Sequence, residues 1–396
     1  MALLKEKLLP TIKPERHSVL DRIVSERMSA EEKAEVVDEF LEKLDNQEIA
    51  EIKEGEIELS PRQMELVAEA NRLIASALKS AGIVPKIEIK PSMVHMVRPD
   101  VFERYKKKKG IEAKSVAAWV SIDEQAILVK AEEYDELQFL DRIIHEILHM
   151  NSFVSFQTVD MAEDADDSVS IVERRTGLRM KETKVEGSKK AGNKKKIAGK
   201  MFFNDLDEAV IEKLAVDIIR NFNIRIAPEE KSNFDKSEKL RKILIEHIRK
   251  ILQDRSGEVS EIEISELGAL YAVLSWQAIL LPEAGVFLER YESSQDPFVL
   301  EQAISFYYDQ EAEDLIPSFA YNPQRVMLDK LMSDILKKNA AKFKNPRDVA
   351  LLFVKASFEG RVLPLARVIE DTFGKGSFRR LGEGENITAK FSEENL

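Results

Sequence analysis

The stretch Asp135–Phe153, which reads DELQFLDRIIHEILHMNSF, decides the predicted fold. Its apolar residues recur at spacings of three and four positions, which is the period of a helix with one buried face. The residues on that face are Leu140, Ile143, Ile144, Ile147 and Leu148. Because His145 and His149 are four positions apart, this helix carries them one turn apart on the adjacent face.

This pair of histidines indicates a specific chemistry. Two imidazoles one turn apart can both reach a single zinc ion. Glu146 would lie beside a water molecule held at such an ion, and could accept its proton as the water attacks a carbonyl carbon. The chain has only five histidines, and two of them fall in this short pattern. The alternative is an ordinary helix with two unrelated histidines.

A catalytic zinc site needs a third protein ligand beside the two histidines. The chain contains no cysteine, so only histidine, aspartate and glutamate are available. The remaining histidines do not continue the pattern HExxHxxGxxH after His149; they are His17, His95 and His247.

The segment Asn204–Ala215, NDLDEAVIEKLA, is the better source of the third ligand. Glu208 and Glu212 lie one helical turn apart, beside a row of apolar residues. Such a pair suits one metal ligand and one carboxylate that accepts a hydrogen bond from a ligating histidine. The alternative is local, because Asp205 and Glu208 also have the spacing of a helix-capping pair.

HEILH at 145–149, followed by LDEAVIE at 206–212, resembles the gluzincin metallopeptidases, the thermolysin-like group. In that group two histidines and one glutamate hold zinc, and the glutamate stands in a helix with a pattern such as NExxxD. Matched residue by residue, the resemblance implies that Glu208 is the ligand and that Glu212 orients a histidine. The chain departs from the pattern with Asp207 for asparagine, Glu212 for aspartate, and 58 residues between His149 and Glu208.

The segment Ala117-Ala118-Trp119 adds to this resemblance, which covers roughly residues 115–215. It precedes a predicted hairpin turn and a strand that leads to the HEILH helix. In thermolysin-like enzymes an edge strand of this kind lines the substrate cleft, and an edge strand can pair with an extended peptide. The alternative is a plain hairpin with a core tryptophan.

The same family also uses a tyrosine or histidine to stabilise the oxyanion. We expect Tyr321 in this role, because it precedes a helix that begins with a proline. The other candidates are His247, Tyr271, Tyr291, Tyr307 and Tyr308.

The predicted fold class is α+β, with a zincin-like core of a small mixed sheet and the active-site helix, and with largely helical N- and C-terminal regions. We divide the chain into a helical region at 1–85, a sheet and active-site-helix subdomain at 86–203, and a helical subdomain at 204–396. Strands are expected between 84 and 130. Residues 154–203 are expected to be irregular apart from one hairpin, with a solvated acidic run at 160–167 and a solvated lysine-rich loop at 184–200.

The composition of 44% hydrophobic and 33% charged residues is that of an ordinary globular protein. The net charge of −12 disfavours a nucleic-acid partner. We expect no membrane partner and a cytoplasmic location, because no run approaches the roughly 20 apolar residues of a membrane span.

The sequence thus predicts a peptidase with one zinc ion per chain, acting on a peptide or protein substrate through Glu146 as the general base. The oligomeric state is not predicted. Two alternatives remain: an inactive zinc-binding structural or interaction protein on a peptidase fold, and an amidohydrolase acting on small molecules.

Overall fold

Helix α5 (Glu136–Asn151) begins and ends close to the predicted limits. The Asp135 side chain accepts a hydrogen bond of 2.7 Å from the amide of Gln138, which satisfies one of the free amides at the start of the helix. Helix α3 (Pro61–Ser80) packs against α5, and its N-cap residue Ser60 forms a capping box with Gln63. It ends before Gly82, whose φ of +74° favours glycine.

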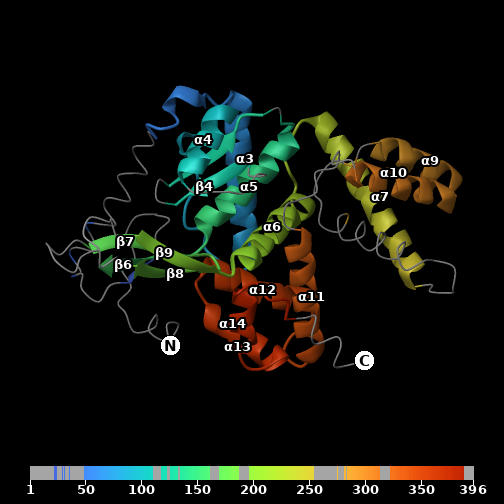
Figure 1. Cartoon of the computed structure of the whole chain (residues 1–396). Coiled ribbons are helices and arrows are strands. Elements are labelled where there is room, and N and C mark those ends of the chain that lie inside the picture. The colour runs from blue at the N-terminus through green and yellow to red at the C-terminus, as the bar shows by residue number, and fades with distance from the viewer. Residues whose placement is uncertain are drawn as a thin grey trace.

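The chain is a mixed α+β protein, mostly helical, with two small sheets, as the computed structural model in Figure 1 shows. The described residues are 22–24, 29, 31, 35, 49–109, 117–122, 125–132, 134–160, 169–186, 196–253, 274, 281, 283–312 and 322–387. Most of residues 1–48 in the predicted helical region, most of the acidic run, the centre of the lysine-rich loop and Tyr321 lie outside them.

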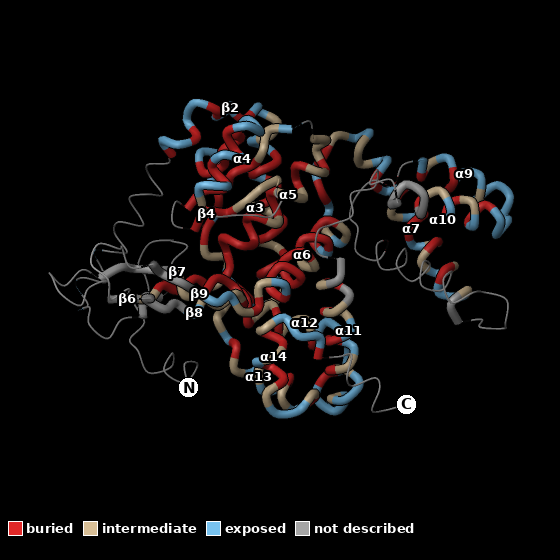
Figure 2. The backbone as a smooth tube through the Cα atoms, viewed as in Figure 1, coloured by how far each residue is buried: buried red, intermediate tan, exposed pale blue. Residues whose placement is uncertain are grey.

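The first sheet has four strands in the order β2-β3-β5-β4, with β3 parallel to β5 and the other pairs antiparallel. The strands are β2 (Glu56–Ile57), β3 (Val94–Val97), β4 (Ala118–Ser121) and β5 (Ala126–Lys130). The β4–β5 hairpin is confirmed. Helices α3 and α5 share one core cluster with one face of the sheet, and helix α4 (Pro99–Lys108) packs on the other face. Figure 2 shows mostly buried residues where α3 and α5 meet the sheet, and exposed residues around β2 and α4.

Two sequence expectations were wrong in this region. Residues 87–89 are not a strand, and a helix, α4, interrupts the segment that we expected to be all strands. Pro99 stands at the first position of α4, where its fixed φ suits a helix. Val101, Phe102 and Tyr105 then have helical spacing, and all three are buried.

The second sheet corrects the expectation that residues 154–203 are mostly irregular. It has five strands in the order β1-β6-β7-β8-β9, and Figure 1 shows it extending away from the helices. The strands are β1 (Arg22–Val24), β6 (Val154–Asp160), β7 (Val169–Thr176), β8 (Arg179–Glu186) and β9 (Lys196–Phe202). The expected hairpin is present as β7–β8 and turns at Gly177-Leu178. We missed β6, although its residues from Val154 to Gln157 alternate between apolar and polar types, which is the pattern of a strand.

Helix α6 (Asn204–Asn221) belongs to two core clusters. Its C-terminal part joins the core of α3 and α5 through Ile211, Ala215 and Ile218. Its N-terminal part packs in a second core through Leu206, Ala209 and Val210. The other helices of the second core are α11 (Asn322–Lys338), α12 (Pro346–Phe358), α13 (Val362–Phe373) and α14 (Ser377–Gly382).

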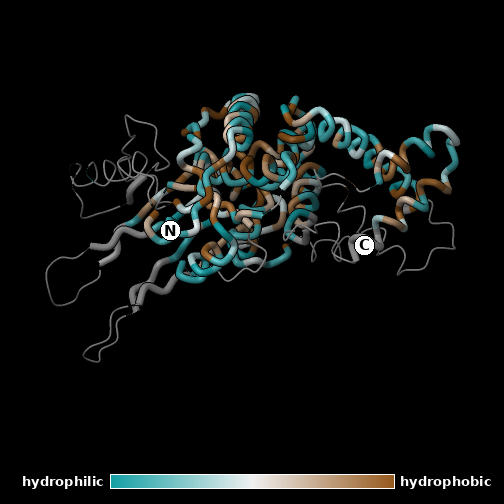
Figure 3. The backbone as a smooth tube through the Cα atoms, turned by 90° about the horizontal axis from the view of Figure 1, so that it is seen from above, coloured by the Kyte–Doolittle hydropathy of each residue, from teal (hydrophilic) through white to brown (hydrophobic). Residues whose placement is uncertain are grey.

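A third core cluster joins three further helices, which are α7 (Pro228–Gln253), α9 (Ala284–Ser294) and α10 (Pro297–Ala312). These helices lie to one side of the other two cores in Figure 1 and in the view from above in Figure 3. The core of α3 and α5 combines residues from all three predicted regions, and the division at 85 and 203 stays a prediction. Among the described residues, no helix is long and apolar enough to cross a membrane.

Hydrogen bonds from Arg175 connect the β7–β8 hairpin to the C-terminal helices. Its buried guanidinium donates hydrogen bonds to three carbonyl oxygens: to Gly177 at 2.7 Å, to Ala356 at 2.6 Å and to Gly360 at 3.1 Å. These bonds hold the turn of the hairpin against the end of α12, because the carbonyls there have no helical partner.

We predict that Arg175→Met lowers the free energy of unfolding by about 3 kcal/mol or more, because it leaves buried carbonyls without donors. Urea denaturation measures this change. Arg174→Met is the control, since it removes a neighbouring charge without these bonds, and should change stability by less than about 0.5 kcal/mol. Equal effects of the two substitutions would contradict this role.

Candidate metal centre

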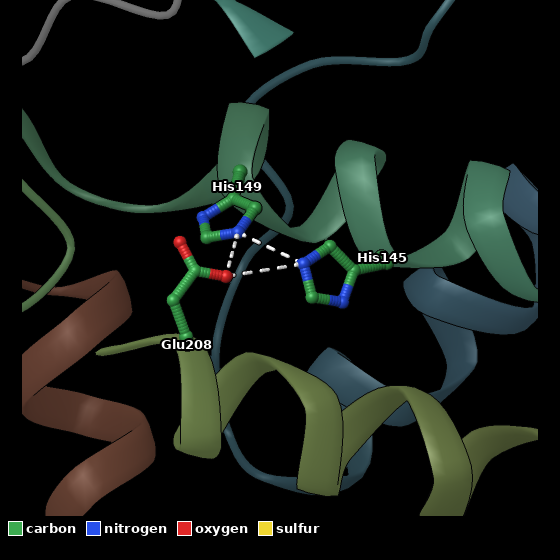
Figure 4. A group of neighbouring side chains, drawn as sticks. All are labelled: His145, His149 and Glu208. Carbon is green, nitrogen blue, oxygen red and sulfur yellow. Dashed lines mark hydrogen bonds and ion pairs between the residues drawn. The ribbon is translucent and has the colours of Figure 1, made fainter. Parts of the chain in front are cut away.

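Three potential metal ligands meet where α5 packs against α6. Helix α5 presents His145 and His149 from adjacent turns, and α6 presents Glu208 from the opposite side, as Figure 4 shows. The segment between His149 and Glu208 forms strands β6, β7, β8 and β9 of the second sheet. It then returns toward α5, so that α6 lies beside α5. The three side chains form a group that could hold a metal ion.

The ligand atoms form a nearly equilateral triangle. Nε2 of His145 lies 3.2 Å from Nε2 of His149, and each nitrogen lies 3.4 Å from Oε2 of Glu208. Ligands at about 2.0–2.1 Å from a tetrahedral ion are separated by about 3.3 Å. The geometry of the triangle therefore fits three corners of a tetrahedral site and leaves the fourth corner for another ligand.

The outer nitrogen of His145 is held by Glu212. Nδ1 lies 2.9 Å from Oε2 of Glu212, one turn after Glu208 on α6. The other oxygen of Glu212 accepts a hydrogen bond of 2.5 Å from the buried guanidinium of Arg325 on α11. A carboxylate at Nδ1 fixes the tautomer that leaves Nε2 free to bind a metal.

The outer nitrogen of His149 faces Asp207. Nδ1 and Oδ2 are 3.8 Å apart, and neither atom has a hydrogen-bond partner among the described residues. Oδ1 of Asp207 accepts hydrogen bonds from the amide of Leu178 at 2.6 Å and from the hydroxyl of Ser357 at 3.4 Å. Each histidine thus has its own acid. From the sequence we interpreted Asp207 only as a departure from asparagine, although an acid directly before the third potential ligand was a usable signal.

Glu146 is buried beside the ligands, and burial raises the pKa of its carboxyl group, against the opposing charges of His145, His149 and Arg179. Another acid, Asp141, stands one turn before His145. Burial and the neighbouring charge of Glu212 raise the pKa of Asp141 to about 7. Sequence reasoning missed Asp141, because its apolar neighbours made the helix look purely structural there.

Negative charge exceeds positive charge in this buried cluster. The carboxylates of Glu146, Asp207, Glu208 and Glu212 face the guanidinium groups of Arg179 and Arg325. Although burial opposes it, hydrogen bonding to Glu208 and Glu212 holds the pKa of His145 well above its usual value. The surroundings thus favour positive charge between the ligands.

The other residues expected at the site lie elsewhere or outside the described residues. Ala118 on β4 packs against the core that contains α5. The Trp119 side chain packs on the opposite face of the sheet, with its ring centre 5.8 Å from that of Tyr105. Ala117 precedes β4, and its carbonyl accepts a hydrogen bond of 2.8 Å from the amide of Lys130. Tyr321 is not among the described residues.

Neither of the two described histidines outside the HEILH pattern belongs to the group. His95 is buried on β3, where Nδ1 lies 2.6 Å from Glu56, and His247 lies on α7. Comparisons of the chain with protein-family models, with curated proteins and with solved structures gave no match.

We predict that Glu208→Ala weakens divalent-metal binding by about 100-fold or more, because it removes one of three ligands from the site. Isothermal titration of the metal-free protein with Zn²⁺ and Co²⁺ measures this change. Asp205→Ala is the matched control on the same helix, since Asp205 is exposed and should bind metal like the unchanged protein. Full metal retention in Glu208→Ala would place the third ligand elsewhere.

Asp207→Asn should weaken metal binding by about 10-fold, because the neutral amide no longer stabilises His149 through its Nδ1. The same titration measures it. Ser357→Ala is the control, since it removes a hydrogen bond to the other oxygen of Asp207 and leaves the charge in place. If Asp207→Asn and Ser357→Ala bind metal equally well, then Asp207 has no influence on His149.

Proposed function

We propose that this chain is a zinc-dependent peptidase of the gluzincin type. The observation that carries the proposal is the triangle of His145, His149 and Glu208, with Glu146 beside it on the same helix. Nitrogen ligands favour a transition metal over calcium or magnesium. An octahedral iron site with two histidines and one carboxylate needs ligand atoms about 3.0 Å apart. The observed 3.2–3.4 Å is closer to the tetrahedral arrangement that zinc adopts.

When bound, zinc would supply a Lewis acid that lowers the pKa of the attacking water and polarises the scissile carbonyl. Glu146 accepts one proton from the water as the water oxygen bonds to the carbonyl carbon and the π electrons move to the carbonyl oxygen. The carbon–nitrogen bond then breaks, and Glu146 gives its proton to the departing amine. One water is consumed, and a carboxylic acid and an amine are formed.

The position of Glu146 suits it to the role of general base. Its neighbours His145 and His149 fix its place relative to the reacting atoms, and burial keeps competing bulk water from its carboxylate. A carboxylate in this position can accept the proton of the attacking water.

The position of strand β4 supports the proposal that the substrate is a peptide. Among the described strands it pairs only with β5, so its other edge offers backbone groups to an extended peptide. It also contacts α5, the helix of the two histidines. Because Trp119 faces away from α5, we assign substrate binding to the backbone of residues 117–119 and not to the tryptophan ring.

Glu146→Gln should reduce peptide hydrolysis by about 10³-fold or more, because the amide cannot accept the proton of the water. Bound zinc should remain at one equivalent, since Glu146 is not a ligand. Cleavage of a peptide library, followed by mass spectrometry, measures the activity, and elemental analysis measures the zinc.

Glu88→Gln is the control for loss of a carboxylate, because Glu88 is exposed and outside the site. Unchanged hydrolysis in Glu146→Gln would refute the mechanism. An unchanged protein that binds zinc and cleaves no peptide would support an inactive binding protein. Cleavage of small amides alone would support an amidohydrolase.

A further inference from the structure

Arg179 reaches the metal centre from the second sheet. It is the first residue of β8 and follows the turn Gly177-Leu178. The amide of Leu178 donates its hydrogen bond to Asp207, so the turn rests on the first turns of α6. A side chain at Gly177 would place its Cβ 2.3 Å from the same carboxylate. This close contact of the turn with α6 fixes the position of the Arg179 backbone beside the metal centre.

The guanidinium of Arg179 lies among the acids of the site. Nε lies 3.5 Å from Oδ2 of Asp207, and Nη1 lies 3.5 Å from Oε1 of Glu208. Oε1 is the oxygen of Glu208 that does not take part in the triangle with the histidines. Glu146 is also close enough to interact electrostatically with Arg179. The guanidinium is therefore beside both the third ligand and the expected base.

The two contacts of Arg179 are long. A charged hydrogen bond of this kind normally measures about 2.7–2.9 Å, so neither carboxylate holds the guanidinium in a close bidentate pair. Nε has no hydrogen-bond partner among the described residues. The side chain is 24% exposed, so it is not sealed inside the core. The guanidinium is positive, because arginine keeps its proton in proteins.

Peptide hydrolysis creates a negative oxygen that needs such a group. When water adds to the carbonyl, the charge develops on the former carbonyl oxygen next to the metal. A fixed cation with several N–H donors stabilises this charge more strongly than it stabilises the neutral carbonyl. The planar guanidinium can donate to an oxygen while it remains beside Glu208.

We infer that Arg179 is a catalytic residue of the proposed peptidase, and that it donates a hydrogen bond to the oxyanion of the tetrahedral intermediate. The inference rests on the proposed function. It assigns to a hairpin arginine the role that sequence reasoning gave to Tyr321. The competing role is purely structural, in which Arg179 only holds Glu208 in place for the metal.

The two roles differ in what the loss of Arg179 changes. The test compares the zinc-loaded full chain with Arg179→Met and Arg179→Lys, and with Arg174→Met as a control on the same hairpin. Three quantities are measured: the zinc affinity, kcat and KM separately, and the affinities of two inhibitors. One inhibitor is a phosphinate peptide, which carries anionic oxygens at the place of the intermediate. The other is a thiol peptide of the same sequence, which binds a metal without that oxygen.

For Arg179→Met we expect zinc affinity within about threefold of the unchanged protein, and kcat about 10²–10³-fold lower with little change in KM. The phosphinate should lose affinity by a similar factor, and the thiol should not. Arg179→Lys keeps a single charged donor and should retain an intermediate kcat. If Arg179→Met does not fold, the ratio of phosphinate to thiol affinity in Arg179→Lys decides, with an expected fall of about tenfold.

Three results would overturn the inference. The first is a loss of zinc affinity whose effect on kcat disappears at saturating zinc, because this shows a structural role. The second is an equal loss of affinity for both inhibitors, and the third is no change in any quantity. Failure of the proposed function is separate and visible in the unchanged protein, which would then bind zinc but neither cleave peptides nor bind the phosphinate.

Discussion

The packing of α5 against α6 is the constraint on which the rest of the structure depends, because it buries several acids where helices normally bury only apolar side chains. An isolated carboxylate in such a place is costly, and hydrogen bonds and opposite charges offset part of the cost for Glu212 and Asp207. Glu212 lies between His145 and Arg325, and Asp207 lies between His149 and the amide of Leu178. The pairing brings residues from both helices, α11 and the β7–β8 hairpin to one point.

The second sheet has a structural role that its position in the sequence does not suggest. It connects His149 to α6, and its β7–β8 turn rests against α6 and the end of α12. Arg175 and Arg179 are four residues apart and lie on either side of this turn. The first bonds carbonyls of the C-terminal helices, and the second faces the acids of the metal centre. One short turn therefore fixes the position of the α6 acids relative to the C-terminal helices.

The parts of this arrangement that depend on local spacing could be predicted from the sequence. The helix of His145 and His149 follows from the period of its apolar residues, and the β4–β5 hairpin follows from two strands around a short turn. The three potential ligands, His145, His149 and Glu208, were also predicted to meet. The sequence contains this information because the spacing of residues along a helix determines the direction in which their side chains point.

The parts that depend on contacts between distant segments could not be predicted in this way. Arg325 and Arg179 are ordinary basic residues in the sequence, and only the packed fold brings them to Glu212, Asp207 and Glu208. Helix α4 was missed because its short apolar pattern also fits strands, and the second sheet because its charged residues resemble those of a solvated loop. Trp119 was expected near the substrate, but the alternation of side chains along β4 turns it toward α4.

Helix α6 belongs to two cores, with Glu208 and Glu212 near the boundary between its two buried parts. Because of this position, binding of a cation at the site is coupled to the stability of both cores. Loosening of either core removes one of the surfaces that hold α6, and so spreads the three ligand atoms apart. A cation that binds only to the assembled triangle is then a ligand of the native state, and its binding free energy adds to the stability of both cores at once. Ion occupancy and cooperative unfolding are in this way two measures of a single equilibrium.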